Sequence, residues 1–330
     1  MTIDVHAHYV PASILKAVEQ NPSLYGSRLD GPPGAGGCLC YDYGLTLRPF
    51  YHALLDLDDR WEVMARQGVD RQVLSVWADL FGYGMPAEDG ARWHRLMNDR
   101  LGEEVQEHSE RLSMLASVPL QDAHRAATEL EYGVKELGAL GGVVAPSVDG
   151  INLGESPLDD FWAAAVELDV PIFIHPTQPV PAPRTHNFGL NVIVQYIYDS
   201  TVSVGTLIFG GVLDRFPDLK LILSHGGGFF SYQIGRFDRI YRNMGPGEAS
   251  AQPPSAYLGR FWYDTIVHNA AALSFLRDLV GSEKILLGTD YPFPVDDPDP
   301  IGSVGQVGFS AQEITQVTSG NAQQLFKLSE

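Results

Sequence analysis

Short apolar runs alternate with longer amphipathic stretches along most of the chain. The runs are rich in β-branched and aromatic residues, which favours buried strands, and the stretches carry apolar residues at helical spacing. The predicted strands cover Ile3–His8, Gln72–Trp77, Ser113–Pro119, Gly142–Ala145, Pro171–His175, Leu219–His225, Phe261–Val267 and Ile285–Asp290. The predicted helices cover Trp93–Glu107, Ala123–Leu137, Pro157–Leu168, Ile193–Arg215 and Ala270–Val280. This alternation predicts a parallel sheet.

The number of strand–helix units decides between two kinds of parallel sheet. Eight units over roughly 290 residues fit a (β/α)8 TIM barrel better than an open sheet. An open doubly wound sheet would normally carry a glycine-rich phosphate turn after its first strand, and His6-Ala-His8 stands there instead. We therefore predict an α/β fold, a TIM barrel in a single domain over residues 1–330. A long insertion follows strand 1 at about residues 10–58, where it would cover the C-terminal mouth of the barrel.

Composition and charge exclude several classes of protein. Hydrophobic residues make up 45% of the 330 residues and charged residues 19%, which excludes a disordered or fibrous chain. Lys and Arg total 22 against 41 Asp and Glu, so the formal charge is −19. A surface this acidic disfavours nucleic acid and anionic membranes as partners.

No targeting or membrane signal is predicted. The N-terminus has neither the basic nor the apolar region of a signal peptide. The longest apolar run that could be a transmembrane segment, around Val202 to Leu213, is interrupted by Ser and Gly. Cys38 and Cys40 lie two residues apart, which gives neither a disulfide framework nor a Cys-x-x-Cys pair. We expect a cytoplasmic protein.

Two histidines end the first predicted strand. His6 and His8 lie two residues apart, so both imidazoles project from the same face of an extended chain. Two such imidazoles can share one divalent cation. The alternative is a pair of surface histidines in a turn.

Three further polar residues end other predicted strands. His175 closes a continuous apolar run, where a buried imidazole needs a hydrogen-bond partner or a ligand. His225 precedes three glycines, which permit a close backbone approach or simply a tight strand-to-helix connection. Asp290 follows the eighth strand, where a buried carboxylate favours a cation partner and a helix N-cap is the alternative. Four histidines and one aspartate at the ends of strands 1, 5, 6 and 8 together predict a metal site.

These motifs resemble the amidohydrolase superfamily. Within it, the chain is similar to the amidohydrolase-2 group, typified by aminocarboxymuconate-semialdehyde decarboxylase, and the similarity runs from Thr2 to about Phe326. The motifs that carry it are Asp4-Val-His-Ala-His8, His175-Pro, Ser224-His-Gly-Gly-Gly228 and Gly288-Thr-Asp-Tyr-Pro-Phe-Pro294. The bridging lysine of the two-metal members is absent from strand 4, where Val143-Val144-Ala145 stands, so the resemblance implies one metal ion.

The resemblance also implies a role for each of these residues. His6, His8, His175 and Asp290 would ligate one zinc ion per chain, with manganese or iron as other candidates. His225 would act as general base on the metal-bound water, and Asp290 would shuttle a proton while remaining a ligand.

Substrate contacts follow from the same resemblance. Arg48 and Arg236 would anchor a substrate carboxylate, and Phe293 would contact the substrate. In the family, the arginine at the position of Arg236 crosses a dimer interface, so we expect a homodimer. For both arginines the alternative is ordinary surface ion pairing.

Three functions remain open at this level. The first is a metal-dependent decarboxylase, without organic cofactor, of a small unsaturated or aromatic carboxylic acid. The second is a hydrolase or hydratase of the same group, acting on a lactone, amide or enol acid. The third is a non-catalytic barrel that keeps its metal, and His225 argues against it because a structural zinc site needs no spare base.

Residues outside these motifs do not identify the substrate. The 178–191 segment does not match the lid of the typical member, although Arg184 and His186 could add polar contacts there. His268 follows strand 7 and could contact the site or only its rim. The remaining histidines are interpreted as solvated: His52, His94, His108 and His124.

Overall fold

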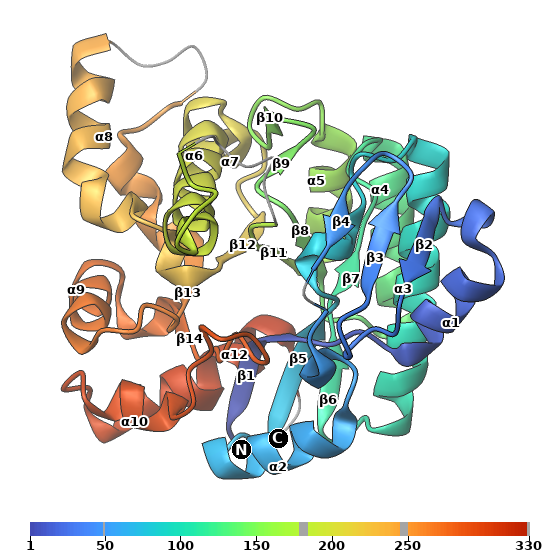
Figure 1. Cartoon of the computed structure of the whole chain (residues 1–330). Coiled ribbons are helices and arrows are strands. Elements are labelled where there is room, and N and C mark those ends of the chain that lie inside the picture. Colours follow the sequence, from blue (N-terminus) through green and yellow to red (C-terminus); the bar gives the residue numbers. More distant parts are fainter. Residues whose placement is uncertain (49, 178–183, 245–249, 329–330) are drawn as a thin grey trace.

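The computed structural model describes residues 1–48, 50–177, 184–244 and 250–328. Parallel strands form its centre, with helices around them (Figure 1). The barrel strands are β1 (Ile3–His8), β5 (Arg71–Ser75), β6 (Leu112–Met114) continued by β7 (Ala116–Ser117), β8 (Gly142–Val144), β11 (Pro171–Ile174), β12 (Lys220–Leu223), β13 (Phe261–Asp264) and β14 (Ile285–Leu286).

Backbone hydrogen bonds close these strands into a ring. They pair in the order β1-β5-β6 and β7-β8-β11-β12-β13-β14, and each of these pairs is parallel. The Leu115 amide, between β6 and β7, donates to the Leu74 carbonyl at 2.8 Å and joins the two sheets. At the other seam, the Val5 amide donates to the Leu287 carbonyl at 2.9 Å. The predicted (β/α)8 barrel is confirmed.

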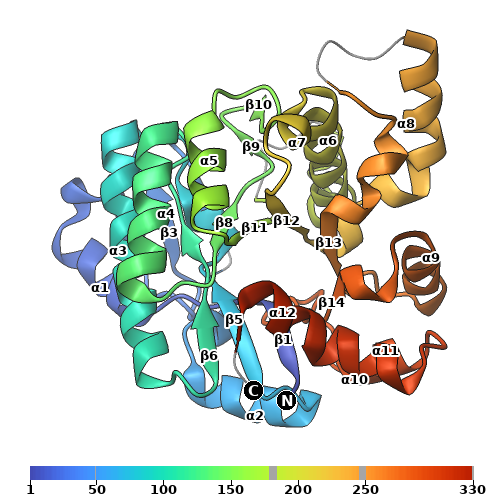
Figure 2. The same cartoon turned by 180° about the vertical axis from the view of Figure 1, so that it is seen from behind.

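An outer layer of helices covers the barrel in both views (Figures 1 and 2). The helices are α2 (Leu57–Gln67), α3 (Ala87–Glu107), α4 (Ala123–Leu137), α5 (Asp159–Glu167), α6 (Tyr196–Phe209), α7 (Val212–Arg215), α8 (Phe230–Met244), α9 (Ala270–Val280), α10 (Pro300–Gly305), α11 (Ala311–Thr315) and α12 (Asn321–Phe326). Helices α4 and α9 have the predicted bounds. The single helix predicted to end at Arg215 is instead split between α6 and α7, because Gly211 takes a left-handed conformation (φ 68°).

A small antiparallel sheet lies between β1 and α2 in the sequence. After α1 (Ala12–Gln20), the strands β2 (Ser27–Asp30), β3 (Cys38–Tyr41) and β4 (Thr46–Leu47) pair in that order, beside α3 in Figure 1. The buried Tyr41 hydroxyl donates to the Leu80 carbonyl at 2.9 Å. This bond fastens the small sheet to the loop after β5, at the end of the barrel that carries the predicted site.

His94 is buried, so its interpretation as a solvated residue is wrong. Helix α3 begins at Ala87, six residues before the predicted start, and its buried positions include Gly90, Trp93, His94 and Met97. The His94 ring packs 5.8 Å from the Tyr83 ring between ring centres. Burial lowers the pKa of His94 to about 3, so the ring is neutral and belongs to the core. His52 and His124 are exposed as expected, and His108 is half-buried.

One helical stretch within the described residues is long and apolar enough to cross a membrane. It spans Asn191–Phe209, because the π-helical turn η4 (Asn191–Gln195) continues into α6, and its 19 residues have a mean hydropathy of 1.3 in the most apolar window. Its inner face is buried against the barrel, including Val204, Leu207 and Ile208. A core helix of a folded domain meets the same criterion, so the stretch is weak evidence for a membrane span.

The glycine turn after β12 tolerates no side chain at its last position. Gly228 has φ 68° and ψ −135°, and a Cβ there would lie 2.5 Å from the Ile197 carbonyl oxygen. Replacing Gly228 with Ala should therefore lower the free energy of unfolding by at least about 2 kcal/mol. Urea denaturation followed by circular dichroism measures this change.

Gly235→Ala is the matched control. Gly235 lies on exposed helix α8, and a Cβ there meets no atom within 4 Å. This variant should be unchanged or more stable by up to about 1 kcal/mol. Equal stability of the two variants would contradict the steric interpretation of the turn.

Candidate metal centre

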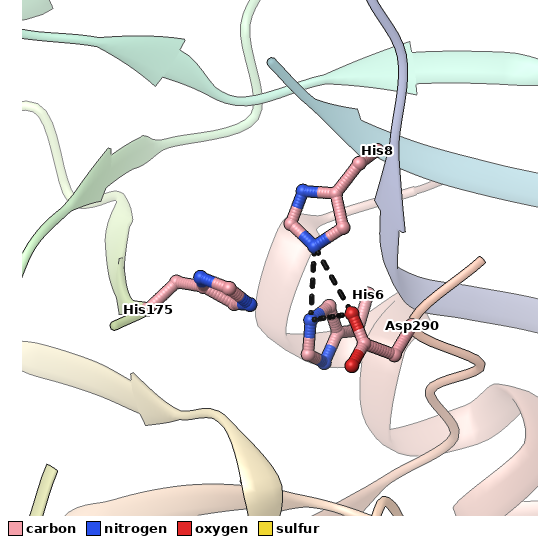
Figure 3. A group of neighbouring side chains, drawn as sticks. All are labelled: His6, His8, His175 and Asp290. Atoms are coloured by element: carbon pink, nitrogen blue, oxygen red, sulfur yellow. Dashed lines mark hydrogen bonds and ion pairs between the residues drawn. The ribbon is translucent and has the colours of Figure 1, made fainter. Parts of the chain in front are cut away.

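Four predicted residues from three parts of the sequence meet at one end of the barrel. His6 and His8 lie in β1, His175 directly follows β11, and Asp290 follows β14 (Figure 3). One ligand atom from each lies within 4.8 Å of all the others. All four residues are buried, with exposed fractions between 0% and 4%. The barrel thus brings together the four predicted metal ligands.

Distances between these atoms fit donors that share one cation. The Nε2 atoms of His6 and His8 are 3.2 Å apart, and Asp290 Oδ1 lies 3.2 and 3.3 Å from them. Donors about 2.1 Å from one ion, at tetrahedral or octahedral angles, are separated by roughly 3.0–3.4 Å. In the described part of the chain, His175 Nε2 is buried without a hydrogen-bond partner. A divalent cation fits this donor set.

Outer contacts orient all three imidazoles in the same way. His6 Nδ1 lies 2.7 Å from Asp264 Oδ2, and His175 Nδ1 lies 2.6 Å from the Pro176 carbonyl. His8 Nδ1 lies 3.0 Å from Ser75 Oγ. With Nδ1–H donating outward, each Nε2 lone pair is directed to the centre, as metal-binding histidines require.

Burial and neighbouring charges determine the protonation states of the four candidate ligands. Burial lowers the pKa of both His8 and His175, which keeps these imidazoles neutral. Burial alone would raise the pKa of Asp290, but the adjacent histidines, His6 first, hold it well below the usual value. His6 differs, because Asp290 and Asp264 raise its pKa to about 10 against the effect of burial. A divalent cation would replace the proton that His6 holds between these two carboxylates.

Asp264 is a positioning residue to which the sequence analysis assigned no role. Besides the His6 imidazole, its carboxylate accepts hydrogen bonds from the backbone amides of His225 at 2.9 Å and Gly226 at 2.8 Å. The same side chain therefore fixes a metal ligand and the turn that carries the predicted base. Asp264 ends β13 in the structure, but the predicted strand ran on to Val267, so the rule that selected polar residues at strand ends did not select it.

A second buried network holds the Asp290 loop against β1. The Asp4 carboxylate accepts hydrogen bonds from the Thr289 hydroxyl at 2.7 Å and the Gln72 amide at 2.9 Å. Burial raises the pKa of Asp4 to about 6. The buried Arg60 guanidinium donates to the same Gln72 side chain and to the His8 carbonyl. These bonds fix the strand and the loop that supply three of the four candidate ligands.

His225 lies beside the ligand set. Its Nε2 is 3.4 Å from Asp290 Oδ2, and its side chain is 10% exposed. His225 has φ 53° and Asp290 has φ 60°, a left-handed backbone conformation that is uncommon for residues other than glycine and recurs at functional sites. These turns also explain why β12 and β14 end earlier than the predicted strands do.

A cavity of about 800 Å³ opens above the metal centre. His225 and Asp290 lie in its wall, together with Arg48, Trp77, Tyr196 and Phe293. The Arg48 guanidinium is 3.3 Å from Asp30, and its side chain is 58% exposed. The Phe293 ring lies 5.2 Å from the His8 ring between ring centres.

Other sequence candidates lie at the rim or outside the cavity. The exposed His268 contributes to the cavity wall. Arg236 is exposed on α8, and it is not among the described residues that line the cavity. Arg184 and His186 are also exposed and outside that lining, and the 178–183 part of the same segment lies outside the described residues.

The fold and this centre define an amidohydrolase, and the chain belongs to that family, whose model matches residues 3–328. The 2-amino-3-carboxymuconate-6-semialdehyde decarboxylase of Dictyostelium discoideum is 32% identical over 97% of this chain and 89% of the relative. Among solved structures, the chain is similar to a dihydroxybenzoic acid decarboxylase of Polaromonas sp. JS666, which was solved with manganese and the inhibitor 2-nitroresorcinol. The two sequences are 25% identical, the TM-score is 0.81, and the match covers 100% of this chain and 97% of the other. The 5-carboxyvanillate decarboxylase LigW of Sphingomonas paucimobilis shares the fold at 23% identity, with a TM-score of 0.84 and 99% coverage of both chains.

Removing both imidazoles of β1 should empty the metal centre. The purified protein is expected to carry about one divalent ion per chain, and the double variant His6→Ala, His8→Ala should carry almost none. Asp264→Asn keeps the ligands but loses the carboxylate that orients His6, so its metal affinity should fall by about 10–100-fold. Elemental analysis and chelator competition measure these effects.

His124→Ala is the control for histidine loss, because His124 is exposed and belongs to none of the candidate ligand groups among the described residues. It should bind metal like the unmodified protein. A fully active protein without metal, or unchanged affinity in Asp264→Asn, would contradict the assignment.

Proposed function

We propose that this protein is a divalent-metal-dependent decarboxylase that uses no organic cofactor. Its substrate would be a small unsaturated or aromatic carboxylic acid. The observation that carries the proposal is a buried set of three histidines and one aspartate with an additional histidine, His225, exposed to the cavity beside it. A structural metal site needs no such residue. The named decarboxylases among the relatives support the same reaction class.

The candidate cation is one divalent ion held by His6, His8, His175 and Asp290. When bound, such an ion polarises substrate oxygens and lowers the pKa of water at the site. Imidazole and carboxylate suit zinc, manganese and iron. Zinc is the ion predicted from the sequence, and the manganese in the Polaromonas relative supports manganese as a candidate.

His225 is proposed to transfer the proton. Decarboxylation breaks the bond between the carboxylate and its carbon, carbon dioxide leaves, and the electron pair stays on that carbon, which takes up a proton. His225 reaches both the cavity and Asp290, so it can deliver this proton or remove one from water. Asp290 accepts the hydrogen bond of protonated His225 and relays the proton. The low pKa of Asp290 favours its ionised form, which suits a ligand and acceptor.

Arg48 and Phe293 are proposed to hold the substrate. A substrate carboxylate would compete with Asp30 for the Arg48 guanidinium, which already lines the cavity. The Phe293 ring, packed against His8 and 6.0 Å from Trp77, offers an aromatic wall to a flat substrate.

We also propose that the active form is a homodimer in which Arg236 enters the partner's site. Tyr232, Arg236 and Ile240 are exposed at four-residue intervals on α8 and therefore share one face of the helix. Tyr232 is 74% exposed and Ile240 is 44% exposed. Helix α8 lies at the outer edge of the molecule (Figure 1). An exposed row of aromatic, arginine and aliphatic residues is typical of protein interfaces.

The first test is product analysis with carboxylated muconates, hydroxybenzoates and small lactones. We expect carbon dioxide release without ring opening. His225→Ala should keep the metal and lower turnover by roughly 10²–10⁴-fold, because it removes the proton donor but no ligand. Carbon dioxide detection and elemental analysis on the same sample separate these effects.

His186→Ala is the control, since this exposed histidine lies outside the cavity lining. Hydration or ring opening in place of carbon dioxide release would favour the hydrolase or hydratase function. Loss of metal from His225→Ala, with normal activity per bound ion, would show that His225 is a ligand instead.

The shared site is tested by mixing two variants. Arg236→Ala and His225→Ala homodimers should each be nearly inactive, and heterodimers should recover part of the activity because one of their two sites keeps both residues. Subunit exchange is followed by native mass spectrometry. A fully active monomer, or mixed dimers without recovered activity, would contradict this arrangement.

A further inference from the structure

Two thiols contact each other in the small antiparallel sheet, outside the metal centre. Cys38 and Cys40 stand at alternate positions of β3, so their side chains project from one face of the strand and Leu39 projects from the other. The two Sγ atoms are 3.1 Å apart, and both cysteines are free and buried. The chain has two cysteines in all, so this pair accounts for every thiol of the protein. The proposed function gives the pair no role.

A carboxylate from the neighbouring strand completes a group of three donors. Strand β2 pairs with β3 in antiparallel register, with Asp30 opposite Cys38, so the side chains of these two residues share one face of the sheet. A carboxylate oxygen of Asp30 and the two sulfurs all lie within 4.8 Å of one another. The thiols are buried, whereas the Asp30 side chain is 69% exposed, so the group is open to solvent on one side. A cation can enter from that side.

Two features of this group favour a shared cation over a disulfide. Residues two apart in a strand have Cα atoms separated by roughly 6.4–6.8 Å, which is the upper end of the range that a disulfide spans. A cation between the sulfurs requires no such approach of the backbone. In addition, a disulfide has no use for a third donor, whereas a cation does, and Asp30 supplies one.

The sulfur ligands determine which kind of cation fits. Thiolates prefer zinc and other soft cations, whereas magnesium and calcium prefer oxygen ligands. Two sulfurs about 2.3 Å from a tetrahedral zinc ion lie roughly 3.8 Å apart. From their present 3.1 Å, the sulfurs of Cys38 and Cys40 would have to separate by less than about 1 Å, which rotation of the side chains supplies.

We propose that Cys38, Cys40 and Asp30 form a second metal site, which binds a soft divalent cation such as zinc or cadmium and ties β2 to β3. Both thiols lose their protons when the cation binds, and water completes its coordination. This inference goes beyond the proposed function and does not depend on it.

The second site is expected to bind its cation more weakly than the metal centre does. Burial raises the pKa of the Cys40 thiol, which opposes the deprotonation that a cation requires. The Arg48 guanidinium, 3.3 Å from Asp30 Oδ2, competes for the carboxylate. The purified protein should therefore still carry about one ion per chain, at the metal centre, and the second site should fill when a soft cation is added.

Cadmium titration tests the site, because a thiolate-to-cadmium charge-transfer band in the ultraviolet can come only from Cys38 and Cys40 in this chain. The reduced, manganese-loaded protein should develop this band, with an end point of about one thiolate-bound cadmium ion per chain, and magnesium should produce none. Cys38→Ser and Cys40→Ser should each lower the cadmium affinity by at least about 10-fold, a loss typical even of residues that only support a ligand. In the unmodified protein, bound cadmium should protect both thiols from alkylation, as measured by mass spectrometry.

Three further variants keep the test decisive. Asp30→Asn removes an exposed ligand and should lower the cadmium affinity by at least about 10-fold, which provides the result if the cysteine variants do not fold. Asp42→Asn is its matched control, because Asp42 is exposed, directly follows β3, and belongs to none of the candidate ligand groups among the described residues. It should bind cadmium like the unmodified protein. The double variant His6→Ala, His8→Ala should keep the band, since its substitutions affect only the metal centre.

The outcomes separate the second site from the metal centre and from the proposed function. Absence of the band in the reduced protein, or unchanged cadmium affinity in a single-cysteine variant or in Asp30→Asn, would overturn the inference. Loss of the band from the folded double histidine variant would also overturn it, because cadmium binding would then depend on the metal centre. No outcome involves turnover, so failure of the decarboxylase assay leaves this result unaffected, and the reverse is also true.

Discussion

The Asp264 carboxylate holds the site together. It accepts one hydrogen bond from the imidazole of His6 and two from the backbone amides of His225 and Gly226. The first bond sets the tautomer of a candidate metal ligand, and the other two hold the turn that places the candidate base. Because all of these groups are buried or nearly so, this charge-assisted network is strong and its loss would leave several polar groups unpaired. Asp264 therefore links the candidate metal ligand His6 to the turn that carries the candidate base His225.

The same arrangement explains why the centre suits a cation. His8 and His175 are kept neutral by burial, and Asp290 is kept ionised by the adjacent histidines, so three of the four ligands are already in the state that a metal requires. Only His6 has to lose a proton when a cation binds. Above them, the cavity is bordered by Arg48 and Asp79, which have opposite charges. The lower part of the site therefore suits a cation.

The sequence pattern was sufficient for the barrel and for the group of residues at its mouth. Buried parallel strands give nearly continuous apolar runs, so a polar residue such as His175 or Asp290 is conspicuous at the end of one. The pattern was less reliable for a polar residue within a helix. His94 lies in the predicted helix as well as in α3, but it is buried on the same face as Trp93 and Met97, whereas its polar character had suggested exposure to solvent.

The sequence by itself determined which polar residues follow the buried strands of the barrel and hence which could meet at its mouth, because buried parallel strands are continuous apolar runs and a polar residue after one is conspicuous. Only the tertiary structure decided how these residues are supported. Asp264 contacts His6 because the closed barrel brings the ends of β13 and β1 together, and the Tyr41 hydroxyl reaches the Leu80 carbonyl because the small sheet lies against the loop after β5. Such contacts join residues far apart in the chain, and no local pattern of hydrophobic and polar positions records them.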